Sequence, residues 1–119
     1  MAQEEIGRRV ELAWLAAFYG PMLTGKQREV LAMHCEEDMS LGEIAQAAGI
    51  SRQGVHELLT RAADKLTRAE EQLHMAARFR RMEDGLFRCR ESLRAGRLQE
   101  CEDVLDELIR LEQEENNGL

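Results

Sequence analysis

Residues 39–59, MSLGEIAQAAGISRQGVHELL, carry the pattern of two short helices joined by a tight turn. Ser40 is suited to be the N-cap of the first helix, and Glu43 three residues later completes a capping box. Gly49 stands where this helix must end, in a left-handed conformation that favours glycine. Ser51 is placed to cap the second helix. The stretch therefore predicts a helix-turn-helix motif.

The apolar and polar residues of this stretch separate as the motif requires. Ile44 and Ala48 of the first helix are expected to pack against Val55 and Leu58 of the second, and the small Ala45 allows a close crossing. The second helix then points a polar set outward: Ser51, Arg52, Gln53, His56, Glu57 and Thr60. In a helix-turn-helix this surface enters the DNA major groove. Glu57 would repel phosphate unless it accepts a hydrogen bond from a cytosine amino group.

Composition indicates a small, nearly all-α chain of 119 residues, with 33% charged residues and a single proline. No apolar run approaches the ~20 residues of a membrane helix, so we expect no membrane association. The N-terminus lacks the apolar block of a signal peptide. The three cysteines are widely spaced, which favours a reduced, cytoplasmic setting.

Charge is distributed unevenly along the chain, whose formal net charge is −7. Residues 1–51 have four basic and eight acidic residues, a charge of −4. Residues 52–97 have eleven basic and seven acidic residues, +4, and residues 98–119 have one basic and eight acidic residues, −7. The positive charge thus begins at the proposed recognition helix. It is weaker than the basic footprint of a tight DNA binder.

Two helices are expected before the motif. The first covers residues 3–19 and ends at Tyr19-Gly20-Pro21. Its predicted core stripe is Ile6, Val10, Ala13, Trp14, Ala17 and Phe18. Thr24 caps the second, with Gln27 as its capping-box partner and with Leu23, Val30, Leu31 and His34 on one side. Lys26 and Arg28 in its first turn either approach the DNA backbone or are ordinary solvated charges.

A long helix and a helical hairpin are expected after the motif. From Arg52, a helix of ~30 residues carries a heptad seam: Val55, Leu59, Ala62, Leu66, Ala69, Leu73 and Ala76. Its distal half would pack on the C-terminal helices or on a second copy of the chain. We expect a helix-turn-helix domain at 1–75, which includes the start of this helix, and a hairpin with an acidic tail at 76–119.

The hairpin is expected to turn at residues 95–97. Phe79, Met82, Leu86, Phe87 and Leu93 would line its first arm, and Leu98, Cys101, Val104, Leu105, Leu108 and Leu111 its second. The arginines of the first arm could hold a nucleic acid or an acidic partner. The favoured interpretation is that they pair with acidic residues across the hairpin: Glu100, Glu102, Asp103 and Glu107.

No catalytic constellation is present in the sequence, which has no phosphate-binding glycine loop, paired-cysteine metal spacing or HExxH motif. His34 and Cys35 could be combined with His74, Cys89 or Cys101, but the spacing does not support a metal site. We therefore expect a protein without enzymatic activity, metal or cofactor.

The chain resembles the YlxM-like family of small bacterial helix-turn-helix proteins. The resemblance lies in FYGPMLTGKQREVL at 18–31 and EEDMSLGEIAQAAGISRQGVHELLTRAADKL at 36–66, about half of the chain. The same region is similar to the DNA-binding fourth region of bacterial sigma factors. This resemblance implies an all-α fold, suggests a dimer, and implies a role near the signal recognition particle. The chain departs from the pattern at His34-Cys35, which replace an aromatic pair, and the hairpin from about residue 76 lies outside the matched part.

Two functions follow as hypotheses. In the first, the chain binds duplex DNA as a homodimer and regulates genes linked to the signal recognition particle. Arg52 and Gln53 would then contact bases, beside Ser51, His56 and Thr60, while Lys26, Arg28 and Arg61 neutralise phosphates. In the second, the long helix and hairpin bind a protein or the RNA of the signal recognition particle, without specific DNA binding.

Overall fold

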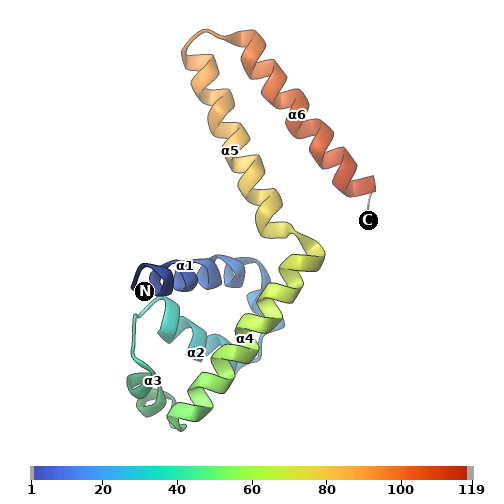
Figure 1. Cartoon of the computed structure of the whole chain (residues 1–119). Helices are drawn as coiled ribbons and strands as arrows, with labels where there is room; N and C mark the ends of the chain where they lie inside the picture. Colours follow the sequence, from blue (N-terminus) through green and yellow to red (C-terminus); the bar gives the residue numbers. More distant parts are fainter. Residues whose placement is uncertain (1, 118–119) are drawn as a thin grey trace. The chain divides into compact units, whose positions relative to one another are not determined.

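All of the regular structure in the described residues is helical (Figure 1). The structure is a computed structural model that describes the backbone of residues 2–117 and the burial of residues 7–116. Its elements are α1 (Ala2–Tyr19), the 3₁₀ turn η1 (Gly20–Met22), α2 (Gly25–Cys35), α3 (Leu41–Ala48), α4 (Arg52–Leu73), α5 (Met75–Arg94) and α6 (Leu98–Asn117). The predicted all-α class is confirmed. The chain forms two compact units, Met1–Ala76 and Ala77–Leu119, each described by itself below.

The capping interactions of the motif form as the sequence predicts. The Ser40 hydroxyl accepts from the Glu43 amide and the Glu43 carboxylate accepts from the Ser40 amide, both at 3.1 Å. These hydrogen bonds lower the pKa of Glu43. Gly49 ends α3 with φ of 71°, and the Ser51 hydroxyl accepts from the Gly54 amide at 2.9 Å. Thr24 and Gln27 form the same capping box at the start of α2.

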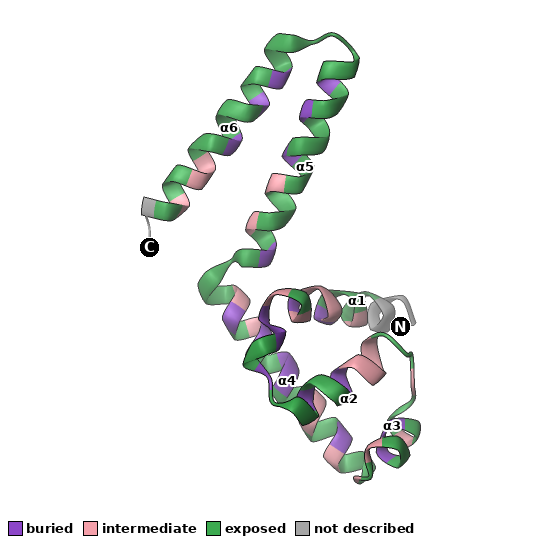
Figure 2. Cartoon of the chain, turned by 180° about the vertical axis from the view of Figure 1, so that it is seen from behind, coloured by how far each residue is buried: buried purple, intermediate pink, exposed green. Residues whose placement is uncertain are grey.

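Two clusters of apolar side chains hold the N-terminal unit together, and α4 contributes to both (Figure 2). The motif cluster contains Val30 of α2, Ile44 and Ala45 of α3, and Val55 of α4. The second cluster joins α1, the turn after it and α2 to the middle and end of α4, and includes the first turn of α5. Its buried members are Leu12, Leu15, Tyr19, Leu23, Leu31, Ala62, Ala63, Leu66, Ala69 and Ala76. Helix α4 is therefore the common support of α1, α2 and α3.

The buried face of α1 differs from the predicted stripe. Val10 is 63% exposed and Ala17 is exposed, whereas Leu12, Leu15 and Tyr19 are buried. Trp14 and Phe18 are only partly buried, and the side chain of Ile6 lies outside the described residues. The C-terminal half of α1 is apolar around much of its circumference, so its periodicity permits several faces. Packing against α2 and α4 selects among them.

The predicted long helix is interrupted at His74, which takes a left-handed conformation with φ of 54°. Two side chains satisfy the first amides of α5: the Tyr19 hydroxyl accepts from the Met75 amide and the Glu70 carboxylate from the Ala76 amide, both at 3.0 Å. The Tyr19 hydroxyl also donates to Glu70 at 2.6 Å. These side chains act as an N-cap supplied by tertiary structure. The expectation of one continuous helix is therefore wrong.

The packing expected for the distal half of this helix also needs correction. Ala62, Leu66 and Ala69 are buried against α1 of the same chain, which takes the place of the C-terminal helices or the second copy. Ala76, just beyond the break, belongs to the same cluster. Leu73 is 45% exposed and lies outside it. The small alanines of the seam let α1 approach α4 closely.

The C-terminal unit is a helical hairpin in which α5 and α6 turn at residues 95–97, as predicted. Its core is small and consists of Cys89, Cys101, Val104 and Leu108, with Met82 packed against them. Four residues predicted to line the first arm are exposed instead: Phe79, Leu86, Phe87 and Leu93. On the second arm, Leu98 and Leu105 are exposed as well. The cause is geometric, because two helices alone can bury only one strip of each helix.

Ion pairs cross the hairpin, as the favoured interpretation predicts, with largely different acidic partners. Arg78 pairs with Glu112 at 2.7 Å and with Glu115, and Arg81 also pairs with Glu115. Of the acidic residues named from the sequence, Glu107 lies 4.0 Å from Arg88, and Glu100 pairs locally with Arg97.

Among the described residues, no helix is long and apolar enough to cross a bilayer.

Candidate nucleic-acid interface

The predicted reading surface is exposed on the first half of α4. Six residues of α4 and its cap form it, all exposed: Ser51, Arg52, Gln53, His56, Thr60 and Arg61. Val55 and Ala62 on the opposite side are fully buried, which fixes the rotation of α4 about its axis. The packing therefore leaves the polar residues available to a groove of DNA, as the motif requires.

The Arg52 side chain lies beside Gly42 of α3. A Cβ atom built on Gly42 would lie 2.9 Å from the nearest terminal nitrogen of the Arg52 guanidinium, which is the far end of a flexible, exposed side chain. The neighbouring Gln53 amide lies 3.5 Å from the Glu57 carboxylate.

The two predicted phosphate contacts on α2 have partners within the chain. The Lys26 ammonium donates to the Ala48 carbonyl oxygen at 2.8 Å, which ties α2 to the end of α3. It also lies 3.7 Å from the Glu29 carboxylate. The Arg28 guanidinium lies against Gly20, where a Cβ atom would be 3.4 Å from its nearest nitrogen. Both side chains remain exposed.

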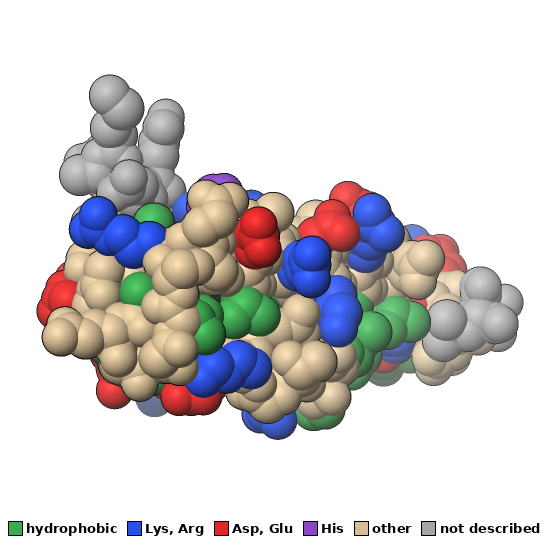
Figure 3. Space-filling view, turned by 90° about the horizontal axis from the view of Figure 1, so that it is seen from below, with side chains coloured by type: hydrophobic (Ala, Val, Ile, Leu, Met, Phe, Trp, Pro, Cys, Tyr) green, Lys and Arg blue, Asp and Glu red, His purple; other side chains and the backbone are tan. Residues whose placement is uncertain are grey.

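Acidic residues share the exposed side of α4 with the basic ones. Glu57, Asp64 and Glu71 are exposed, and Asp64 forms an ion pair with Arg68 at 3.2 Å. Seen from the side of the molecule shown in Figure 3, basic side chains are scattered and acidic ones lie among them. The N-terminal unit thus offers separate positive groups without a continuous basic surface on this face.

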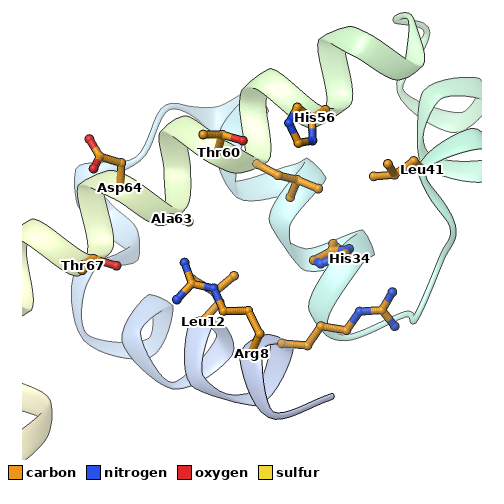
Figure 4. Close-up of a pocket in the computed structure, with 11 residues that line it drawn as sticks. Arg8, Leu12, His34, Leu41, His56, Thr60, Ala63, Asp64 and Thr67 are labelled. Carbon is orange, nitrogen blue, oxygen red and sulfur yellow. The ribbon is translucent and has the colours of Figure 1, made fainter. Parts of the chain in front are cut away.

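A groove of about 840 Å³ runs between α1 and the exposed side of α4 (Figure 4). It is lined by Arg8, Arg9, Leu12, His34, Leu41, His56, Leu59, Thr60, Ala63, Asp64 and Thr67. Two reading-surface residues, His56 and Thr60, therefore stand at the wall of a groove. Arg8 and Arg9 could not be assigned to this groove from the sequence, because nothing in the local pattern places the start of α1 opposite α4. Arg9 is paired with Asp38.

Of the cysteine and histidine residues considered as metal ligands, Cys89 and Cys101 lie together in the hairpin core. No group of three or more His, Cys, Asp or Glu side chains in the described part of the chain could hold a metal ion. Burial raises the pKa of the Cys35 and Cys101 thiols, which keeps them protonated at neutral pH. Both are therefore poor metal ligands and weak nucleophiles.

Comparison with known proteins matches residues 6–108 to the model of the UPF0122 family, described as "Putative helix-turn-helix protein, YlxM / p13 like". The chain belongs to this family. Similar members include UPF0122 proteins of Symbiobacterium thermophilum, 46% identical over 70 residues, and Caldanaerobacter subterraneus, 42% identical over 76. These matches cover 59% and 64% of the chain and 65% of each relative, so the matched region spans about two thirds of their length. A Clostridium botulinum member is 36% identical over 86 residues, 72% of the chain and 79% of that protein.

Membership of UPF0122 extends the resemblance seen in the sequence. The family match begins in α1 and continues to Leu108 in α6, the last core residue of the hairpin. The match therefore extends into the hairpin, beyond the part of the chain on which the resemblance was based. The UPF0122 pattern includes both units.

Proposed function

We propose that this UPF0122 protein is a non-enzymatic, DNA-binding regulator that acts as a homodimer on genes linked to the signal recognition particle. The carrying observation is the geometry of α3 and α4, with both helices capped, Gly49 at the turn and the polar residues of α4 exposed. The link to the signal recognition particle is supported by the family resemblance alone.

In this proposal, Arg52 and Gln53 contact base edges in the major groove, because both lie in the first turn of α4. Ser51, His56 and Thr60 extend the contact along the same surface. Arg61 and Arg28 neutralise phosphates. Lys26 can do the same while it remains on the Ala48 carbonyl, because an ammonium group has three donors and this bond uses one.

A second candidate is a module that binds a protein or the RNA of the signal recognition particle. The acidic residues on the exposed side of α4, Glu57, Asp64 and Glu71, favour it because they oppose a close approach of duplex phosphates. In this case the motif is a scaffold, and Arg52 has no role in binding.

The deciding experiment is fluorescence anisotropy of the full chain with labelled duplex DNA and with signal recognition particle RNA, across a salt series. The DNA proposal expects binding that weakens steeply with salt and prefers some sequences. Arg52→Glu should weaken binding at least about 10-fold, since a lost base contact costs about 1–3 kcal/mol. Arg110→Glu on α6 changes the net charge equally and serves as the control. Equal affinity of the two variants would remove Arg52 from the interface, and RNA binding alone would favour the second candidate.

A further inference from the structure

The C-terminal hairpin presents two different strips on each of its helices. In α5, an exposed row of apolar side chains, Phe79, Leu86 and Leu93, repeats every seven residues. Three residues after its first two members come Met82 and Cys89, which pack in the hairpin core. In α6, the exposed Leu98 and Leu105 are likewise followed three residues later by the buried Cys101 and Leu108. Each helix thus buries one strip inside the hairpin and leaves a neighbouring strip exposed.

The two exposed strips form one face of the hairpin. Helices α5 and α6 run antiparallel, and in both the exposed row precedes the buried row by three residues. Both exposed rows therefore turn to the same side of the pair. In Figure 2 the buried positions of α5 and α6 lie on the sides that face each other. We call the remaining side the apolar hairpin face, formed by Phe79, Leu86, Leu93, Leu98, Leu105 and Ile109.

The area of the apolar hairpin face approaches that of a stable protein interface. Its six side chains are 41–67% exposed. Taking about 180 Å² for a fully exposed residue of this size, they present roughly 570 Å². Covering this face on two copies would bury about 1,150 Å² in total, close to the ~1,200 Å² at which standard interfaces begin. Monomeric proteins rarely leave a contiguous apolar patch of this size uncovered.

The charges of the hairpin favour a second copy of the chain as the partner that covers the apolar hairpin face. Helix α5 has six arginines and three acidic residues, a charge of +3, whereas α6 has one arginine and eight acidic residues, −7. Arg90 and Glu102 stand at equivalent places beside the face, each four residues after an exposed leucine. A two-fold axis parallel to the helices would place the basic α5 of each copy along the acidic α6 of the other. The same surface is then complementary to itself, as a two-fold interface requires.

We infer that the apolar hairpin face binds the same face of a second chain, so that the two hairpins form a four-helix bundle. In such a bundle each helix packs against two neighbours along adjacent strips, which matches the paired rows of α5 and α6. The bundle supplies a hydrophobic core larger than the four buried side chains of one hairpin. This inference rests on the homodimer of the proposed function and identifies its interface. It requires no DNA.

The first test is the mass of the full chain by sedimentation equilibrium, without nucleic acid. We expect twice the chain mass of 13.6 kDa at tens of micromolar. Leu86→Glu places a charge on the apolar hairpin face and should weaken the dimer at least about 100-fold. Val10→Glu is the matched control, because Val10 is a 63% exposed apolar side chain of α1 in the other unit, and it should stay dimeric. A monomeric wild type, or a Leu86→Glu variant that stays dimeric, would overturn the inference.

A charge exchange tests the pairing when folding of Leu86→Glu is in doubt. Arg90→Glu and Glu102→Arg each put like charges along the proposed α5–α6 contact, so each should weaken the dimer by itself. Mixing the two variants should restore a heterodimer, because opposite charges then meet at both of the equivalent contacts. No restoration, with normal helical content by circular dichroism, would contradict the arrangement.

The anisotropy experiment separates the two proposals. A chain that dimerises through this face but binds no DNA leaves the inference standing and removes the proposed function. A wild-type chain that binds DNA as a monomer removes the inference together with the homodimer, and leaves the DNA-binding part of the proposed function standing.

Discussion

At the level of single residues, Gly85 sets how closely the two helices of the hairpin approach. A Cβ atom built on it would lie 2.5 and 2.6 Å from the two methyl carbons of Leu108, and 2.9 Å from the Leu108 Cγ. Such distances are far below a normal carbon–carbon contact. Leu108 is buried, so its side chain has little room to move away. Glycine at this position is therefore a packing requirement of the α5–α6 contact.

Gly85→Ala should destabilise the chain by about 1–3 kcal/mol, because overpacking outweighs the gain in helix propensity. Urea unfolding followed by circular dichroism would measure this change. Gly7→Ala in α1 is the control, since nothing lies within 4 Å of a Cβ at that position. The control should be neutral or stabilising by up to about 1 kcal/mol. An equally stable Gly85→Ala variant would mean that the hairpin packs less tightly than the structure shows.

At the level of elements, the junction between α4 and α5 depends on Tyr19, a residue of α1. Tyr19 is 2% exposed, and its hydroxyl both donates to Glu70 and accepts from the Met75 amide. Burial, followed by the hydrogen bond and the charge of Glu70, raises the pKa of Tyr19 above its ordinary value of 10.0. The end of one helix thus fixes where another begins.

Tyr19→Phe should lower the free energy of unfolding by about 1–3 kcal/mol, because the Met75 amide loses its acceptor and the buried Glu70 bond is lost. The variant keeps the ring and so isolates the hydroxyl. Urea unfolding at neutral pH measures the loss. A variant as stable as the wild type would show that water replaces the hydroxyl at no cost.

The Tyr19 hydroxyl also makes the stability of the folded chain depend on pH. Because the folded pKa of Tyr19 is raised, its contribution is fully present below pH 10.0 and is lost as pH rises toward the folded value. The stability difference between wild type and Tyr19→Phe should therefore shrink above pH 10. Tyr19 is the only tyrosine, so absorbance titration of phenolate formation reports its pKa directly. A midpoint at or below 10.0 in the folded chain would contradict this account.

At the level of the whole molecule, the inferred dimer couples stability to protein concentration. Binding that occurs only between folded chains raises the melting temperature by mass action. For a chain of this size, a hundredfold increase in concentration should raise Tm by about 5 °C. Calorimetry over this range would measure the shift, and Leu86→Glu should abolish it. A concentration-independent Tm in the wild type would argue for a monomer.

Part of the candidate site follows from the local sequence pattern, and part of it depends on how the helices pack. Exposure of Arg52, Gln53 and His56 could be predicted, because a helix with Val55 buried must turn these residues outward. The contact of Arg52 with Gly42 could not, since it depends on the crossing of α3 and α4. The groove beside α4 could not be predicted from the sequence either, because its opposite wall comes from α1.

The sequence by itself determined the caps, the turns and the motif, because their hydrogen bonds join residues three or four positions apart. Ser40 with Glu43, and the left-handed Gly49, need no distant partner. Only the tertiary structure decided which face of α1 is buried, where the long helix breaks and which apolar rows of the hairpin remain exposed. The break is the clearest case, since Tyr19 and Glu70 are 51 residues apart. Their hydrogen bonds compete with a continuous helix, and only packing brings them together.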